Sequence, residues 1–194
     1  VGAAAALAGL IALNIAENGA ANDAAPALER GAGAVCLQDV LDVRSKQELV
    51  ALFRAGRAAD PRALAGREFR GQLLPLGPLW ASSWAITHVL FAPLAFWVGK
   101  GFSADGTSGH NRFDNADGAL RAREFRCAPD EPSALDGRPC LVLDYAGDAL
   151  WGDLAGMRDE LREVAPGLLV GLGSMRATGG PLNCAPFVLS VEKK

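Results

Sequence analysis

Residues 133–145, Ser-Ala-Leu-Asp-Gly-Arg-Pro-Cys-Leu-Val-Leu-Asp-Tyr, carry the pattern that decides the fold class. The Asp136-Gly137 pair favours a tight hairpin turn, because both residue types tolerate positive φ. After this turn, residues 141–145 place apolar side chains at every second position, which is typical of a β-strand. Val142 lies on the opposite, outer face of this strand, so we expect this face to be largely shielded from water too.

The same turn dipeptide, Asp-Gly, occurs at 105–106 and at 117–118, with short aromatic and branched runs around it. Six to eight short strands are expected between residues 66 and 192, joined mostly by hairpin-length turns. Such a sheet loses its unpaired edges when it closes on itself. The sequence therefore predicts a mainly β protein, an antiparallel barrel with short helices. Eight strands would enclose room for side chains or for one small apolar ligand.

Two short helices are predicted before the strands. Ser45 and Glu48 have the spacing of a capping box, in which each side chain satisfies a backbone amide of the other residue. Apolar residues at helical spacing follow, so we expect a helix over about 46–55. Asp60-Pro61 has the features of a second helix start, with a capping residue and proline at the first helical position.

The region from 153 to 176 carries two further patterns. Apolar residues recur at intervals of three and four and predict a helix that ends at Pro166; these residues are Leu154, Met157, Leu161 and Val164. The later run Gly-Leu-Gly-Ser-Met-Arg at 171–176 begins like a dinucleotide-binding fingerprint. Arg176 stands where the third glycine belongs and no helical pattern follows, so a dinucleotide site is rejected.

Residues 71–99 contain no formal charge, and His88 is their one titratable group. Proline at 78 starts a helix and Pro93 ends it, which leaves roughly 14 residues or about 21 Å, too short to cross a bilayer. A helix that is apolar nearly all round either plugs the barrel or lies against a membrane or a partner. The residues expected to make this outside contact are Leu79, Trp80, Trp84, Leu90 and Phe91. Trp97 also suits headgroup depth, because tryptophan combines an apolar body with one donor.

Residues 1–16 form a second uncharged run, which Glu17 ends. As a helix this run would span roughly 24 Å, less than the roughly 30 Å of a bilayer's hydrocarbon core. Three interpretations stay open: the remnant of a targeting segment, a membrane anchor, or a helix docked on a partner. Its expected contact residues are Leu7, Leu10 and Ile11. The chain then divides into an apolar segment with a linker (1–34), a short helical region (35–65) and the barrel (66–194).

The inventory of chemical groups excludes several classes of function. A net charge of −3 gives no electrostatic basis for binding nucleic acid. Metal sites are not expected, because the two histidines lie far apart and the acidic pair Asp114 and Asp117 lacks the glutamate that closes a calcium loop. His110 is expected in a loop. The four cysteines form no Cys-x-x-Cys motif and leave free thiols or a disulfide equally open. No catalytic constellation is found, so an enzyme is not the favoured interpretation.

His88 has two interpretations. A neutral imidazole on an apolar, Trp-lined helix can ligate the magnesium of a chlorophyll. The alternative is a structural histidine that is held by hydrogen bonds. A chlorophyll or a carotenoid at an interface is accordingly the cofactor to consider.

Several segments follow one another in a recognisable order: GREFRGQLL (66–74), WVGKGF (97–102), GHNRF (109–113), SALDGRP (133–139) with LVLDY (141–145), MRDELREVAPGLLVGLGSM (157–175) and NCAPFVL (183–189). This set resembles a lipocalin-like, calycin-type barrel of largely uncharacterised plastid proteins in algae, over about two thirds of the chain. The resemblance implies an accessory subunit beside photosystems and their antennae, attached to the thylakoid membrane. The related xanthophyll de-epoxidases have a Cys-rich region that is absent here, so their activity is not expected.

The leading hypothesis is a non-enzymatic accessory or linker subunit of a thylakoid photosystem–light-harvesting complex. Its partners would be photosystem core or antenna subunits and membrane lipid. The alternative is a lipocalin-like carrier or enzyme for a carotenoid, tetrapyrrole or lipid, with Tyr145, Arg112 or His110 pointing into the barrel. A third option is a soluble plastid protein whose Trp-rich segment is simply core.

Overall fold

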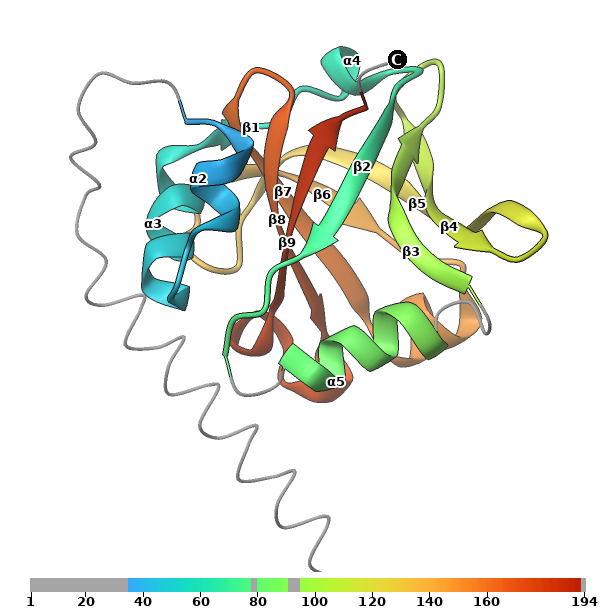
Figure 1. Cartoon of the computed structure of the whole chain (residues 1–194). Helices are drawn as coiled ribbons and strands as arrows, with labels where there is room; N and C mark the ends of the chain where they lie inside the picture. The colour runs from blue at the N-terminus through green and yellow to red at the C-terminus, as the bar shows by residue number, and fades with distance from the viewer. Residues whose placement is uncertain (1–34, 78–79, 91–94, 193–194) are drawn as a thin grey trace, which may run out of the picture.

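Eight antiparallel strands form a closed barrel (Figure 1) in the computed structural model, which describes residues 35–77, 80–90 and 95–192. The strands are β2 (Glu68–Leu73), β3 (Ala95–Phe102), β4 (Ser108–Asn115), β5 (Gly118–Pro132), β6 (Pro139–Asp144), β7 (Met157–Ala165), β8 (Leu168–Met175) and β9 (Ala185–Val191). Each strand pairs with the next along the chain, and β9 also pairs with β2, which closes the ring. The two-residue strand β1 (Arg57–Ala58) is added beside β7. The prediction of an antiparallel barrel is confirmed.

The three Asp-Gly pairs lie where the sequence placed them, in the turns β3–β4, β4–β5 and β5–β6. The glycine of each pair has positive φ: 73° at Gly106, 114° at Gly118 and 69° at Gly137. Side chains rarely adopt this conformation, so glycine at these positions lets the chain reverse without strain.

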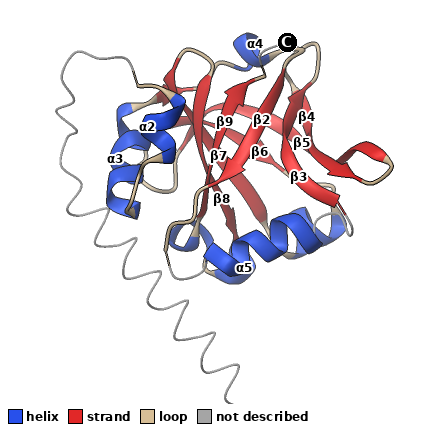
Figure 2. Cartoon of the chain, viewed as in Figure 1, coloured by secondary structure: helices blue, strands red, loops and turns tan. Residues whose placement is uncertain are grey.

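Two helices, α2 (Leu37–Leu41) and α3 (Lys46–Ala55), cover one outer side of the barrel (Figure 2). Val40, Leu49 and Phe53 on these helices pack with Val142 and Val170 from the outer faces of β6 and β8 into a second apolar core. The dry outer face expected at Val142 is therefore confirmed. The barrel interior holds a separate core.

The two predicted helix starts are confirmed. The Ser45 hydroxyl accepts a hydrogen bond from the Glu48 amide at 3.2 Å, and α3 begins at the next residue. The Glu48 carboxylate accepts a hydrogen bond from the backbone N–H of Arg44 at 2.9 Å, whereas the capping box predicts a bond from the backbone N–H of Ser45. This half of the capping box therefore differs from the expectation. Asp60 caps α4 (Pro61–Leu64), which lies at the end of the barrel opposite α5 (Figure 1).

The helix predicted from Leu154, Met157, Leu161 and Val164 is wrong. Residues 149–154 form a π-helix, η2 (Ala149–Leu154), and Met157 begins strand β7. The sequence pattern did not indicate a strand, because both faces of β7 are buried. Met157 and Leu161 belong to the interior core, while the Arg162 side chain is fully buried on the outer face. A strand that is buried on both faces does not show the simple alternation of apolar and polar residues that marks a half-exposed strand.

Some predicted contact residues lie outside the described part of the chain: Leu7, Leu10 and Ile11, and also Leu79 and Phe91. The predicted N-terminal apolar helix lies outside it too, and for Leu90 only the backbone is described. Within the described residues, no helix combines the length and the apolar character that a membrane crossing requires.

Candidate functional site

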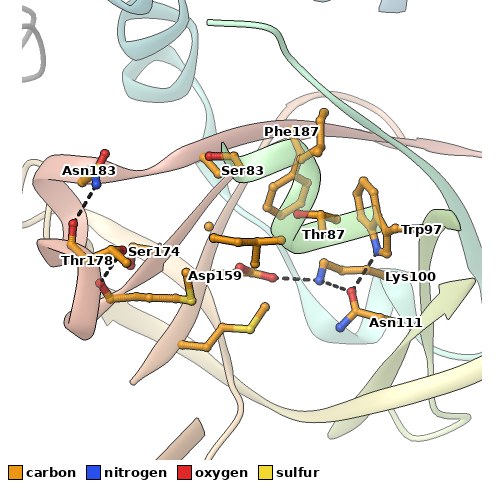
Figure 3. A pocket seen from close by; sticks show the side chains of 16 residues that line it. Ser83, Thr87, Trp97, Lys100, Asn111, Asp159, Ser174, Thr178, Asn183 and Phe187 are labelled. Carbon is orange, nitrogen blue, oxygen red and sulfur yellow. Dashed lines mark hydrogen bonds and ion pairs between the residues drawn. The ribbon is translucent and has the colours of Figure 1, made fainter. Parts of the chain in front are cut away.

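A cavity of about 330 Å³ lies at one end of the barrel, where β2, β4 and β8 end and β3, β7 and β9 begin. The helical segment α5 (Trp80–Ala85) and η1 (Ile86–Leu90) covers this end (Figure 1). Its walls are mainly apolar and include Leu73, Ile86, Trp97, Met157, Met175 and Phe187. Hydroxyl and amide side chains also line it: Ser83, Thr87, Ser174, Thr178 and Asn183 (Figure 3).

The floor of the cavity is a buried ion pair. The Lys100 ammonium on β3 lies 2.7 Å from Oδ2 of Asp159 on β7, and the two side chains are only 2% and 3% exposed. Lys100 also donates to Oδ1 of Asn111 at 2.7 Å and to the hydroxyl of Tyr145 at 2.7 Å. An ammonium has three protons, so all of its donors are used.

Asn111 and Tyr145 complete this network. The Trp97 indole N–H donates to Oδ1 of Asn111 at 2.9 Å. The Asn111 amide donates to the Tyr145 hydroxyl at 3.1 Å and to the Arg123 carbonyl at 3.2 Å. The Tyr145 hydroxyl donates in turn to Oδ2 of Asp159 at 2.8 Å. The polar floor is thus one connected hydrogen-bond network, which we call the floor network: Lys100, Asn111, Tyr145, Asp159 and the Trp97 indole.

A β-bulge supplies the carbonyl that the network uses. Arg123 has φ of 56°, and the register between β4 and β5 shifts at this position. A bulge inserts one unpaired residue and re-aims the backbone around it. Here the Arg123 carbonyl accepts from the side chain of Asn111.

Aromatic rings surround the Lys100 ammonium. Its Nζ lies 5.8 Å from the ring centroid of Trp97, 5.2 Å from Phe125, 5.5 Å from Tyr145 and 5.3 Å from Phe187. Burial lowers the pKa of Lys100, and the Asp159 carboxylate opposes this effect by charge and by its hydrogen bond. Burial also raises the pKa of Tyr145 well above its usual value. Ring faces and a counter-ion together stabilise the buried cation.

Two glycines of β8 make room for the cavity. A Cβ at Gly171 would lie 2.2 Å from the Phe187 ring, and a Cβ at Gly173 would lie 2.9 Å from Oδ1 of Asp159. These residues belong to the run that begins like a dinucleotide fingerprint. Their function is steric: they leave space for an aromatic wall and for the carboxylate.

Of the three side chains expected to point into the barrel, Tyr145 does so. Arg112 and His110 lie on the outer face of β4, so this part of the prediction is wrong for both. Arg112 forms ion pairs with Glu68 at 3.1 Å and Glu192 at 3.0 Å. The expectation of a loop at His110 is also corrected, because His110 belongs to β4 and pairs with Gly101.

His88 lies on η1 between two aromatic rings. Its centroid lies 5.1 Å from Trp84 and 5.9 Å from Phe96. Nδ1 accepts a hydrogen bond from the backbone N–H of Trp97 at 3.1 Å, which places the proton of the neutral ring on Nε2. Ligation of a chlorophyll magnesium stays a prediction, and it would require this hydrogen bond to change. Trp97 itself is buried in the barrel, so its expected place at headgroup depth is wrong.

The four cysteines are free thiols. Burial raises the pKa of Cys127 to about 11 and that of Cys140 to about 12. Across residues 35–77, 80–90 and 95–192, no cluster of three or more His, Cys, Asp or Glu side chains is placed to hold a metal ion.

Sequence reasoning missed Lys100, Asn111 and Asp159. One local signal pointed to Lys100: it is the one charged residue in the run 96–102, between aromatic and glycine neighbours. Asp159 and Asn111 had no comparable signal, because each stands among other polar residues.

The described architecture is a closed antiparallel barrel of eight strands, which is compatible with a lipocalin-like fold, with a cavity at the end that α5 and η1 cover. No model of a known protein family matches the chain, and no curated protein matches it. A crystal structure of a protein from Thermomonospora curvata is similar, with a TM-score of 0.55 and 17% identity over 76% of this chain and 88% of that one. At this identity the likeness shows the fold alone.

Proposed function

We propose that the barrel binds a small, mostly apolar molecule in its end cavity and acts as a carrier for it. The observation that supports this function is an apolar-walled cavity of about 330 Å³ with a few convergent polar groups at its floor. Ligand cavities of proteins typically measure about 300–1,000 Å³ and have this composition. The volume favours a small molecule, or one end of a carotenoid, tetrapyrrole or lipid.

The floor network adds a second argument. A buried ion pair contributes little to stability, because its attraction must first offset the loss of hydration of both ions. Apolar side chains of similar size would serve a purely structural barrel equally well. The ion pair Lys100–Asp159 lies at the cavity floor, which is the position expected for ligand recognition, and the strained backbone of Arg123 supports it through its bond from Asn111.

Displacement of a fluorescent apolar probe from the full chain tests this function. Thr87→Trp fills the cavity from η1, and Ala81→Trp places the same side chain on an exposed position of α5. We expect Thr87→Trp to weaken probe binding at least tenfold and Ala81→Trp to leave it unchanged. If the wild-type chain binds no probe, or if both variants bind like the wild type, this function is wrong.

As a second function, we propose that the cavity end of the barrel docks on a lipid surface. Six of the seven exposed large apolar side chains among the described residues belong to elements at this end: Trp80, Trp84, Phe96, Leu120, Leu150 and Leu154. Contiguous exposed apolar surface is uncommon on proteins without a partner. Membrane lipid was one of the partners expected for Trp80 and Trp84.

The charges at this end favour an electrically neutral surface. The connections that meet there carry Asp117, Asp148 and Asp153 and one arginine, Arg176. Arg123 on β5 pairs with Asp148 at 3.2 Å, so a small excess of carboxylates is left. Anionic headgroups would be repelled by this excess of carboxylates. We therefore expect binding to vesicles of phosphatidylcholine, with no gain when phosphatidylglycerol is added.

Vesicle sedimentation tests the docking function. Trp84→Ser should lower the bound fraction several-fold, because tryptophan is favoured at the lipid–water interface. Leu37→Ser is the matched control, since Leu37 is as exposed as Trp84 but lies on α2 away from this end. Equal loss in both variants, or no binding by the wild type, would contradict the proposal.

The accessory-subunit function in a thylakoid photosystem–light-harvesting complex stays a prediction. It rests on the resemblance described above and on the exposed Trp80 and Trp84. Purification from mild detergent extracts tests it, because a chain that migrates alone without chlorophyll proteins would contradict it.

A further inference from the structure

We infer that the cavity recognises an uncharged hydrogen-bond donor, such as the hydroxyl or amide group of its ligand, and rejects carboxylates and phosphates. This inference rests on the proposed function of the cavity as a binding site. It specifies the chemistry of the ligand's polar end.

The floor network has no donor to offer a ligand. Lys100 gives its three protons to Asp159, Asn111 and Tyr145. The Asn111 amide gives both of its protons to Tyr145 and to the Arg123 carbonyl. The remaining two donors, the Trp97 indole and the Tyr145 hydroxyl, are used within the network as well. An acceptor such as a carboxylate would therefore have to break an existing bond.

The network does offer an acceptor. Within the described part of the chain, the hydrogen bonds to the Asp159 side chain end on Oδ2. Oδ1 faces Gly173, which lines the cavity and leaves the carboxylate uncovered, because a Cβ at that position would lie 2.9 Å from Oδ1. Each carboxylate oxygen can accept about two hydrogen bonds. A ligand hydroxyl or amide N–H therefore finds its partner at Oδ1.

The charge balance favours the same ligand class. Lys100 and Asp159 are the charged residues that line the cavity, and their charges cancel. An anionic ligand would lose its hydration beside Asp159 without gaining a free cation, and the floor network would offer it no free donor. A hydroxyl or amide loses far less hydration, and its bond to a carboxylate is of the stronger, charge-assisted kind.

Competition by ligands of equal chain length tests the inference on the full chain. 1-Decanol donates a hydrogen bond, methyl decanoate only accepts one, and decanoate is an anion. We expect 1-decanol to displace the fluorescent probe at a concentration at least tenfold lower than either competitor. Equal potency of decanoate or methyl decanoate would overturn the inference while leaving the binding function intact. Failure of every ligand and of the probe would overturn the proposed function itself.

Two variants locate the acceptor. Asp159→Asn removes the negative charge and leaves Lys100 without its counter-ion, so we expect decanol to bind about tenfold less tightly and decanoate to become the preferred ligand. Gly173→Ala covers Oδ1 and leaves the charges unchanged, so it should weaken decanol binding without a gain for decanoate. Ser190→Ala, on the outer face of β9, is the control. An unchanged preference in folded Gly173→Ala would overturn the assignment of Oδ1.

Discussion

Lys100 and Asp159 lie on strands that face each other across the barrel, and their charged atoms are 2.7 Å apart. Three strands separate β3 from β7 in either direction around the ring. The ion pair therefore spans the interior and connects two opposite walls. Both side chains are buried, so removal of one partner leaves the other charge without compensation.

Lys100→Met should lower the free energy of unfolding by about 3–5 kcal/mol, the usual effect of leaving a single buried charge. The double variant Lys100→Met/Asp159→Leu should recover much of this loss, because no charge is left unpaired. Urea unfolding of the wild type and both variants measures the difference. Equal destabilisation in the single and double variants would show that packing, rather than charge, explains the effect.

Tyr145 is the one tyrosine of the chain, so the absorbance of tyrosinate reports this residue alone. Burial raises its pKa well above the usual value near 10. A raised pKa means that the neutral phenol stabilises the fold below pH of about 10, and that this contribution is lost at higher pH. We expect tyrosinate to appear only as the circular dichroism of the barrel is lost. Its appearance near pH 10 in a native barrel would contradict the buried position.

Gly171→Ala should destabilise the barrel by about 1–3 kcal/mol, because its Cβ would lie 2.2 Å from the Phe187 ring. The ring would also shift and change the cavity. Phe187→Leu in the same chain removes the clash, so the two substitutions together should be less harmful than their sum. Strictly additive effects in thermal unfolding would show that the two side chains do not meet.

The pair Arg162–Asp136 should make the protein sensitive to acid. The guanidinium is fully buried and bonds both carboxylate oxygens, at 2.8 and 2.7 Å. Burial alone would raise the pKa of Asp136, but hydrogen bonds from Arg162 and the Arg138 amide outweigh it and the pKa is lowered. A lowered pKa stabilises the fold above pH of about 4, and this contribution is lost as pH falls further.

Asp136→Asn measures this contribution. At neutral pH the variant should be less stable by about 1.5–3 kcal/mol, because charge-assisted hydrogen bonds are lost. Below pH 4 the difference from the wild type should shrink, since the wild-type carboxyl is then protonated as well. A difference that stays constant from pH 7 to pH 3 would contradict the lowered pKa.

The parts of the fold that depend on local chemistry could be predicted from the sequence. The Asp-Gly turns, the capped helix starts and the alternation in β6 need only neighbouring residues, and the structure confirms each of them. Strand β7 could not be recognised, because Arg162 and Glu160 are polar residues that become buried through distant partners.

The floor network could not be predicted from the sequence for the same reason, because its contacts join residues that are distant in the chain. Lys100 and Asp159 become a pair only when the barrel closes and brings their side chains together across its interior, and no local spacing in the sequence indicates that contact. Trp97 was misplaced because hydropathy does not distinguish a barrel interior from a membrane interface. Tyr145 was correctly expected inside, since it continues the apolar alternation of β6.

The pairing of β9 with both β2 and β8 has a consequence for how a guest molecule comes and goes. Every strand of the barrel has a hydrogen-bonded neighbour on each side. A gap between two strands would therefore open only if backbone hydrogen bonds were broken. Under the proposed carrier function, we expect a guest to exchange past the helical segment at residues 80–90, which covers the cavity end of the barrel. The residence time of a guest would then depend on how tightly this helical segment packs against the end of the barrel, and hardly at all on the stability of the hydrogen bonds between the strands.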